Sequence, residues 1–258
     1  MLSDELFIRY QRQICLPELG ELGQKKLSQA HVLVIGCGGL GSAATLYLAA
    51  AGVGRIVLVD DDVVEESNLQ RQIAYRQADI QQAKATALAN QLKQLNSHCH
   101  VRSITQRLAD SQLGLEVTLA DLVLDCSDNL ATRHQVNKAC YKQQTPLISA
   151  AAIGWQGQFI VFDYGIDCPC YRCLYPFDQL NNTQNCSDQG IVGPVVGILG
   201  NYQALAAIQK LSTGQFMLKP NQLHIFDGQG IQWQTLDVVQ DSQCDVCSMA
   251  ISPTGVYL

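Results

Sequence analysis

The stretch His31-Val-Leu-Val-Ile-Gly36-Cys-Gly38-Gly39-Leu-Gly41 decides the fold, because it joins a mostly apolar run to a cluster of glycines. An apolar run of this length is typical of a strand buried on both faces of a parallel sheet. Residues 42–51 are rich in Ala and Leu and predict a helix directly after the glycines. Glycines placed there permit a tight turn and let a phosphate approach the backbone amides at the helix start. We interpret Gly36, Gly38 and Gly41 as a dinucleotide-binding fingerprint, although a bare glycine motif can also serve only to turn the chain.

The alternation of strands and helices continues after this stretch. Apolar runs predict strands at 55–59, 121–125 and 146–150, and an alternating pattern predicts another at 98–105. Residues 79–95 and 129–143 have helical composition. Beyond residue 150 the pattern changes to strands at 156–162, 222–226 and 231–238, with a turn at 227–230 and a helix over 194–211. We expect an α/β protein with a Rossmann-like doubly wound sheet, mostly parallel in the first half and with antiparallel strands in the second.

No internal repeat, low-complexity tract or clear linker divides the chain. We therefore expect a single domain over residues 1–258, with a nucleotide-binding half at 1–150 and a different second half at 151–258. Residues 177–190 are polar and lack periodicity, which predicts a loop that crosses the molecule.

Composition excludes several classes of protein. The chain has 258 residues, 47% of them hydrophobic, and a formal net charge of −6, which argues against general nucleic-acid binding. Residues 30–54 carry no charged side chain, with His31 taken as neutral, but glycines at positions 36, 38, 39, 41 and 52 interrupt them, so no membrane span is predicted. The first ten residues lack the apolar core of a signal peptide, and we expect a cytoplasmic protein.

Polar side chains follow the predicted strands at the edge where ligands bind in such sheets. Asp60 ends the strand at 55–59, where a carboxylate can accept hydrogen bonds from ribose hydroxyls. Arg71 and Lys84 could hold a triphosphate, and Asp128 could hold Mg²⁺ beside it. Taken singly, Lys84 can equally be a solvated helix lysine and Asp128 a helix N-cap. Together with the fingerprint, the set favours ATP.

Four of the eleven cysteines form two C-x-x-C pairs, Cys170/Cys173 and Cys244/Cys247. Two such pairs complete a tetrahedral site with no open position, which predicts one structural zinc ion per chain. A redox-active C-x-x-C is the alternative interpretation, and Cys168 could replace a neighbour as ligand. Cys186 lies alone in the polar loop before a predicted helix. There it can be a nucleophile of lowered pKa or an incidental surface cysteine.

These motifs in combination resemble the ThiF/MoeB family, the bacterial relatives of the ubiquitin-activating enzymes. The resemblance spans residues 6–247, and residues 185–197 and 226–233 look closer to ThiF than to MoeB. It is carried by Arg9-Tyr-x-Arg12-Gln-Ile, Gly36-x-Gly-Gly-Leu-Gly41, Asp60-x-Asp62, Ser67-Asn-Leu-Gln-Arg71, Lys84, Asp125-Cys-x-Asp128-Asn129 and the paired C-x-x-C.

The resemblance implies an adenylyltransferase. Family members use ATP to adenylate the C-terminal glycine of a small ubiquitin-like sulfur carrier that ends in Gly-Gly. The implied pathway is thiamine thiazole biosynthesis, and a MoeB-type enzyme that adenylates the small subunit of molybdopterin synthase is the alternative. Residues 151–258 would then be the carrier-binding half, with the crossing loop and the zinc knuckles.

The resemblance also assigns roles to single residues. Asp60 holds the ribose, Gly39 faces the nucleotide, and Asn68, Arg71 and Lys84 contact phosphates, while Asp128 binds Mg²⁺. Arg12 reaches the partner's site across a homodimer, and Cys186 links covalently to the carrier during sulfur transfer. A separate donor, such as a cysteine desulfurase or a rhodanese-like protein, would supply the sulfur. The full nucleotide-binding set is Gly36, Gly38, Gly39, Gly41, Asp60, Asp62, Asn68, Gln70, Arg71, Lys84, Asp128 and Asn129.

Two other classes of function stay open from the sequence. The glycine fingerprint with Asp60 also fits a nicotinamide-dependent oxidoreductase, which would leave Arg71, Lys84 and Asp128 unexplained. The second class is a catalytically idle binding subunit. Such a subunit has no need of Arg12, Arg71, Lys84 and Asp128 together.

Overall fold

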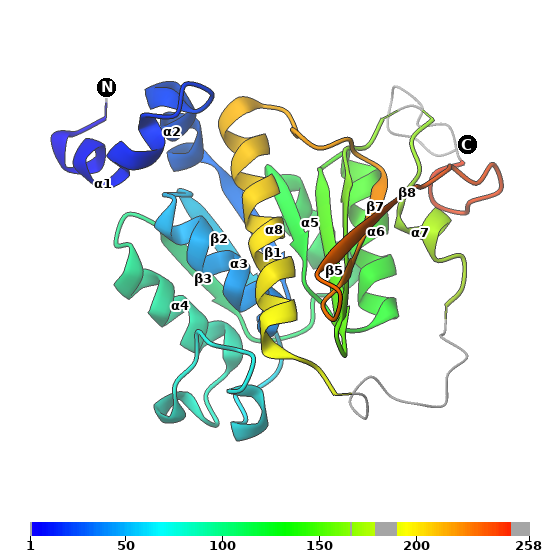
Figure 1. Ribbon diagram of the computed structural model, residues 1–258, viewed down its shortest axis with the longest axis horizontal. Coiled ribbons are helices and arrows are strands. Elements are labelled where there is room, and N and C mark those ends of the chain that lie inside the picture. Colours follow the sequence, from blue (N-terminus) through cyan, green and yellow to red (C-terminus); the bar gives the residue numbers. More distant parts are fainter. Residues whose placement is uncertain (1, 166, 179–189, 249–258) are drawn as a thin grey trace.

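A single eight-stranded sheet runs through the computed structural model, which describes residues 2–165, 167–178 and 190–248 (Figure 1). The strand order is β3-β2-β1-β4-β5-β6-β7-β8. The strands are β1 (His31–Ile35), β2 (Arg55–Val59), β3 (His100–Ile104), β4 (Leu122–Asp125), β5 (Leu147–Ile153), β6 (Gln156–Phe162), β7 (Gln222–Asp227) and β8 (Gln232–Asp237).

Helices fill the connections between these strands. They are α1 (Asp4–Ile14), α2 (Gly20–Gln29), α3 (Gly39–Ala50), α4 (Lys84–Leu95), α5 (Asp110–Leu119), α6 (Leu130–Gln143), α7 (Tyr171–Leu174) and α8 (Gly193–Thr213), with 3₁₀ turns η1 (Glu66–Asn68) and η2 (Gln77–Asp79). Within the described ranges, no helix is both long and apolar enough to cross a lipid bilayer.

The sheet changes character at β5. Strands β1 to β5 pair in parallel, and β5 to β8 pair antiparallel. The predicted fold class, parallel in the first half and antiparallel in the second, is therefore confirmed. Because the carboxyl ends of β1, β2 and β4 lie side by side, the loops that follow these three strands share one edge of the sheet.

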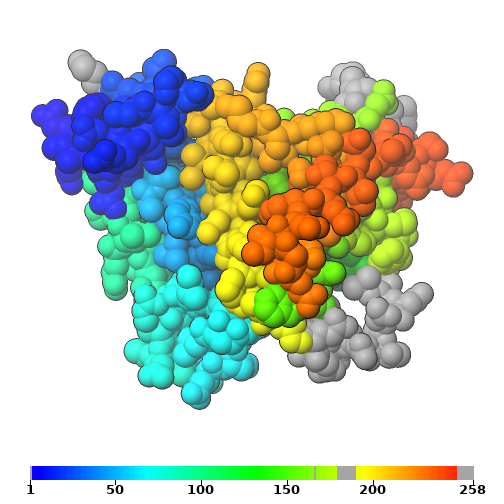
Figure 2. All heavy atoms as spheres, in the orientation of Figure 1, coloured from blue at the N-terminus to red at the C-terminus, as the bar shows by residue number. Residues whose placement is uncertain are grey.

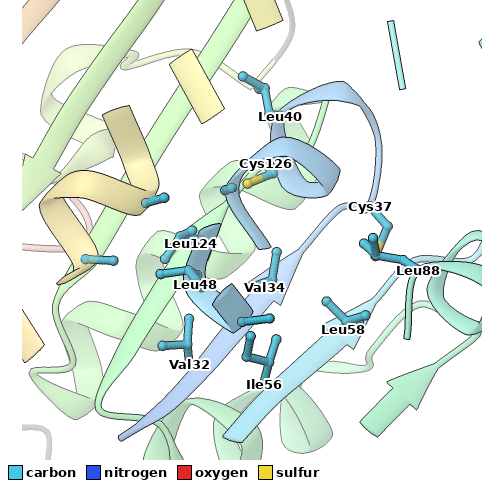
Figure 3. Packing of buried hydrophobic residues seen from close by; sticks show 14 of the residues in the cluster. Val32, Val34, Cys37, Leu40, Leu48, Ile56, Leu58, Leu88, Leu124 and Cys126 are labelled. Atoms are coloured by element: carbon cyan, nitrogen blue, oxygen red, sulfur yellow. The ribbon is translucent and has the colours of Figure 1, made fainter. Parts of the chain in front are cut away.

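Two hydrophobic layers cover the two faces of the sheet. Even-numbered side chains of β1 and β2 pack against α3, α4 and α8, as Figure 3 shows for Val32, Val34, Ile56 and Leu58. Odd-numbered side chains such as Leu33 pack against α5 and α6 on the other face. The continuous apolar run in β1 follows from this burial on both faces.

Helix α8 lies directly against α3 (Figure 1). Gly200 makes this close approach possible, since a Cβ atom there would lie 2.5 Å from the Leu40 carbonyl oxygen. The first hydrophobic layer consequently contains residues from both the 1–150 and the 151–258 halves.

The element boundaries differ from the predictions in a few places. Helix α4 begins at Lys84 rather than at 79, because η2 and the positive φ of Gln81 (70°) interrupt the chain first. Helix α3 begins at Gly39, so Gly41 lies inside the helix rather than before it. Helices α2 and α5 were not predicted from the sequence.

Candidate functional site

The glycine turn after β1 is shaped by backbone contacts. Gly36 has φ of +95°, and a Cβ atom there would lie 2.7 Å from the Cys126 carbonyl oxygen. A Cβ atom on Gly41 would lie 1.9 Å from the carbonyl oxygen of Gly36, so the turn and the helix can meet only through glycine. Gly38 is different: it is the N-cap of α3 with φ of −71°, and a Cβ atom there would meet only the Gln72 amide nitrogen at 3.7 Å. The fold does not need glycine at 38, which leaves space at the helix N-terminus for a ligand.

Asp60 holds this turn in place from the end of β2. Its Oδ2 accepts a hydrogen bond from the backbone N–H of Cys37 (2.6 Å), and its Oδ1 accepts one from that of Asp62 (2.8 Å). Burial raises the pKa of the Asp60 carboxyl, while the two amide donors act in the opposite direction. Each oxygen keeps a lone pair that can accept a ribose hydroxyl.

Lys84 is buried at the start of α4 and is not a solvated helix lysine. Its Nζ lies 3.0 Å from the Asp62 carboxylate, and its backbone N–H donates to the carbonyl oxygen of Asp62. Because the side chain is held at both ends, its positive charge is directed toward the loop after β2. This fixed charge is suited to a phosphate at the neighbouring glycine turn.

The residues around η1 fall into buried and exposed positions. Asn68 is buried, and its Oδ1 accepts from the backbone N–H of Glu65 (3.2 Å), which caps η1. Arg71 is half-buried and donates to the Ser67 carbonyl oxygen (3.1 Å). Gln70 is exposed.

Gln72 belongs to the site although it was not among the predicted residues. It is buried, its amide faces the space at Gly38, and its Oε1 has no hydrogen-bond partner among the described residues. A buried amide with an unsatisfied oxygen calls for a partner that the free chain does not supply. The sequence does not distinguish it from its neighbour, because Gln70 and Gln72 are the same residue type and only burial separates them.

Asp128 follows β4 at the same edge of the sheet and is exposed. It is not the N-cap of α6: the Oδ1 of Asn129 accepts from the backbone N–H of Thr132 (2.9 Å) and performs that role. The pKa of Arg107 is raised first by its hydrogen bond to Asp61, and Asp128 contributes in the same direction. Asp128 and the acidic loop after β2 therefore act on the same cation, Arg107.

A buried ion pair supports the Asp128 loop. Arg133 of α6 lies 3.5 Å from Asp125, and its guanidinium also donates to the carbonyl oxygens of Ser127 and Ala150. The Ser127 hydroxyl in turn donates to the carboxylate of Asp125 (2.6 Å). The backbone directly before Asp128 is thus held by charged and polar side chains that are themselves buried. The sequence indicated none of this network.

Arg12 does not join the site within one chain. Its helix, α1, packs near the far end of α4, where Arg9 donates to the carbonyl oxygen of Leu95 and Asn96 donates to Tyr10 (2.8 Å). Lys84 is the first residue of α4, and this twelve-residue helix is about 18 Å long, so Lys84 lies about that far from α1. Figure 2 shows α1 at one corner of the molecule and the segment between β2 and α4 at another.

The four cysteines of the two C-x-x-C pairs come together, with all their sulfur atoms within 4.8 Å of one another. Cys170 Sγ lies 3.8 Å from Cys244 Sγ, and Cys173 Sγ lies 3.2 Å from Cys247 Sγ. Tetrahedral zinc with Zn–S bonds of about 2.3 Å separates its sulfurs by about 3.8 Å. The donor set fits zinc, and Cys168 is not part of it.

Hydrogen bonds around the cluster fit thiolate ligands. The Asn137 side chain donates to Cys170 Sγ (3.5 Å), and the backbone N–H of Asp241 donates to Cys173 Sγ (3.4 Å). Cys186, predicted as a nucleophile, lies outside the described residues, as does most of the predicted crossing loop.

The arrangement gathers an uncrowded helix N-terminus at Gly38, a ribose acceptor, a buried lysine and an exposed carboxylate at one sheet edge. No described Ser-His-Asp or Cys-His pair accompanies them as an activated nucleophile. Such a site can orient a nucleotide and stabilise charge on its phosphates, which suits transfer of a nucleotidyl group to an acceptor that is already ionised.

Comparison with known proteins agrees with this geometry. The ThiF family profile matches residues 10–247. The chain is 46% identical to the sulfur carrier protein ThiS adenylyltransferase of Escherichia coli over 95% of its own length and 97% of that protein. It is 38% identical to the molybdopterin-synthase adenylyltransferase of E. coli over 95% of its length and 98% of that protein.

Among solved structures, the chain is similar to E. coli MccB with ATP. The TM-score is 0.77 at 25% sequence identity, over 88% of this chain and 69% of MccB.

Proposed function

This chain belongs to the ThiF family, and from that premise we propose that it uses ATP to adenylate the C-terminal glycine of a small ubiquitin-like sulfur carrier. The carrier is ThiS-like and ends in Gly-Gly, and the adenylate prepares it for thiocarboxylate formation in thiamine thiazole biosynthesis. The observation that carries the proposal is the buried Lys84, paired with the exposed Asp62 on the loop after β2, together with the uncrowded N-terminus of α3 at Gly38. A nicotinamide-dependent oxidoreductase would leave this cation and Asp128 unexplained.

The reaction needs orientation rather than proton transfer. A carboxylate oxygen of the carrier bonds to the α-phosphorus of ATP, and the bond from that phosphorus to the oxygen of the leaving pyrophosphate breaks. Because the glycine carboxylate is already ionised near neutral pH, no general base is required. The absence of an activated nucleophile from the described site agrees with this chemistry.

We assign the residues of the site as follows. Asp60 binds the ribose hydroxyls, and the backbone amides at Gly38 and Gly39 approach the phosphates at the N-terminus of α3. Lys84 and Arg71 stabilise negative charge on the phosphates. Gln72 donates to or accepts from the nucleotide through its buried amide, which is unsatisfied in the free chain.

Two metal ions complete the proposal. Asp128 is the Mg²⁺ ligand, since an exposed carboxylate beside a triphosphate suits that ion, which neutralises charge on the phosphates when bound. Asp125 and Arg133 fix the loop that carries it. Zinc is held by Cys170, Cys173, Cys244 and Cys247 in a closed structural site, and it takes no part in the reaction.

Arg12 acts in trans across a homodimer. Within one chain it lies a helix length from Lys84, so it can reach a nucleotide only if a second copy places its α1 beside the site. Cys186 links to the carrier during sulfur transfer, and a separate cysteine desulfurase or rhodanese-like protein supplies the sulfur. Replacing Cys186 with serine should leave adenylation intact and stop sulfur transfer.

The second candidate is a MoeB-type enzyme that acts on the small subunit of molybdopterin synthase. It is favoured by the 38% identity to the E. coli molybdopterin-synthase adenylyltransferase over nearly the whole chain.

Exchange of labelled pyrophosphate into ATP tests the proposal, with the thiazole-pathway carrier and the molybdopterin-pathway carrier supplied separately. We expect exchange with the first carrier and loss of exchange in Lys84→Met. Lys138→Met, on the exposed face of α6, is the matched control and should behave as the wild type. Exchange with only the second carrier would establish the MoeB-type alternative. No exchange with either carrier, together with intact ATP binding, would favour an idle subunit, and tight NADH binding would favour an oxidoreductase.

A further inference from the structure

A hollow lies at the opposite edge of the parallel sheet from the nucleotide site. It has a volume of 440 Å³ and is lined by the first residues of three neighbouring strands, the end of α4 and the end of α5. We call it the basic hollow, and its charged or titratable members are His31, Arg55, Lys93, Cys99, His100 and Arg102. The five residues of β1 separate it from the glycine turn by about 13 Å.

The register of the sheet creates the basic hollow. His31 pairs with Arg55, and Arg55 pairs with His100, so the three side chains stand in one row on the same face. Arg102 lies two residues further along β3 and therefore points to the same face. Parallel pairing thus gathers cations that are far apart in the sequence.

Two of these cations are uncompensated. Arg55 and Lys93 are exposed and make no side-chain hydrogen bond or ion pair with any residue in the described ranges. Arg102, by contrast, pairs with Glu116 of α5. The positive charge left in the basic hollow is therefore that of Arg55 and Lys93.

His31 supplies the observation that points to a ligand. The side chain is 7% exposed, its Nδ1 lies 2.7 Å from the Leu119 carbonyl oxygen, and its Nε2 is buried with no partner among the described residues. Since Nδ1 donates to the carbonyl, the neutral ring leaves Nε2 as an orphan acceptor. Protonation would convert Nε2 into a donor that an anion could satisfy.

We propose that the basic hollow binds a phosphoryl group, either as free phosphate or on a small phosphate monoester. Arg55 and Lys93 supply charge-assisted hydrogen bonds, and protonated His31 supplies a further donor. The volume falls within the range of about 300–1,000 Å³ that small-molecule sites occupy, so an organic part of the ligand can be accommodated.

The proposal carries a pH dependence. In the free chain burial lowers the pKa of His31 and Arg55 adds to this, while the hydrogen bond to Leu119 and the charges of Asp121 and Glu116 oppose it. A bound dianion raises the pKa of His31, so by linkage the affinity for the dianionic form of the ligand increases as pH falls. The charged or titratable groups on the elements packed around the ring are Arg55, His100, Arg102, Lys93, Cys99, Glu116 and Asp121.

The test is an NMR titration of the full chain labelled with ¹³C at the ε1 carbon of histidine. Inorganic phosphate and glycerol 2-phosphate are added separately at constant ionic strength, with chloride as the blank, over a pH series that spans neutrality. We expect saturable shifts of the His31 signal and a rise in its pKa. Tighter binding of the monoester would assign the ligand to a phosphorylated metabolite, and equal binding would assign it to free phosphate; both support the proposal.

Variants make the test specific. Arg55→Gln and Lys93→Gln should each weaken the response of His31 about tenfold, the loss expected for one charge-assisted contact. Lys138→Gln is the matched control and should change nothing, and unchanged signals of His98, His134 and His224 report an intact fold. A His31 signal that ignores both anions, or one that responds in Arg55→Gln and in Lys93→Gln as it does in the wild type, would overturn the proposal.

Discussion

Replacing Gly38 with alanine separates what the fold needs from what the nucleotide needs. The φ of −71° and ψ of −153° are open to any residue, and the added Cβ atom would contact only the Gln72 amide at 3.7 Å. We therefore expect the free energy of unfolding to change by less than about 0.5 kcal/mol, as for substitutions without a clash. The Tm of a domain of this size would then move by less than about 2 °C.

ATP binding should respond very differently. The new methyl group would stand at the N-terminus of α3 and hold the phosphate away from the backbone amides. Loss of one hydrogen bond to a charged group costs about 1.5–3 kcal/mol. The KM for ATP in pyrophosphate exchange should therefore rise by about 10- to 150-fold.

Gly41→Ala is the contrasting variant. Its Cβ atom would lie 1.9 Å from the backbone oxygen of Gly36, and backbone cannot move aside as a flexible side chain can. We expect Gly41→Ala to be insoluble or to melt far below the wild type, and Gly38→Ala to melt normally in the same thermal scan. A wild-type KM for ATP in Gly38→Ala would refute the placement of the phosphates, and a loss of more than about 5 °C in its Tm would refute the packing argument.

Four further predictions concern the remaining groups. Asp128→Asn should abolish pyrophosphate exchange with no change in Tm, because the carboxylate is exposed; normal exchange would remove it from the mechanism. Gln72→Glu places a charge beside the phosphates and should raise the KM for ATP, whereas Gln70→Glu on the exposed neighbour should not, as steady-state exchange will show. Arg12→Ala and Asp128→Ala chains mixed and refolded together should recover about a quarter of wild-type exchange if the site is shared between subunits, and none if it is not. Metal analysis should give one zinc per chain, and Cys244→Ser should lower both the zinc content and the Tm; an undiminished Tm after full chelation would argue against a structural role.

The elements that the sequence predicted best are those with a single strong local pattern. The apolar runs of β1 and β2 matched the predicted bounds because, after the first residue of each strand, burial on both faces leaves no polar position within them. The cysteine cluster could also be predicted from the sequence, since two C-x-x-C pairs have few chemical uses. Helix α5 was missed because its apolar residues are not confined to one face.

The parts of the site that the sequence missed depend on burial and on register. Gln72 and Gln70 are the same residue type two positions apart, and only the packed structure shows that Gln72 is enclosed. Arg133 reads as one more helix arginine until it is found paired with Asp125 beneath the loop. Likewise His31 and Arg55 become neighbours only through strand pairing, and no pattern within either strand records that.

The cysteine cluster has a topological consequence. With zinc bound, residues 170–247 become a closed circuit that carries α8, β7 and β8, and α8 is clamped in turn against α3. A protease that cuts once between Cys173 and Cys244 would then open the circuit without separating the pieces, because each new end is still tethered through the metal or through the sheet. Nicked chains should migrate as one species until a chelator and a denaturant are applied together. A cut in the polypeptide would therefore not by itself divide the folded molecule.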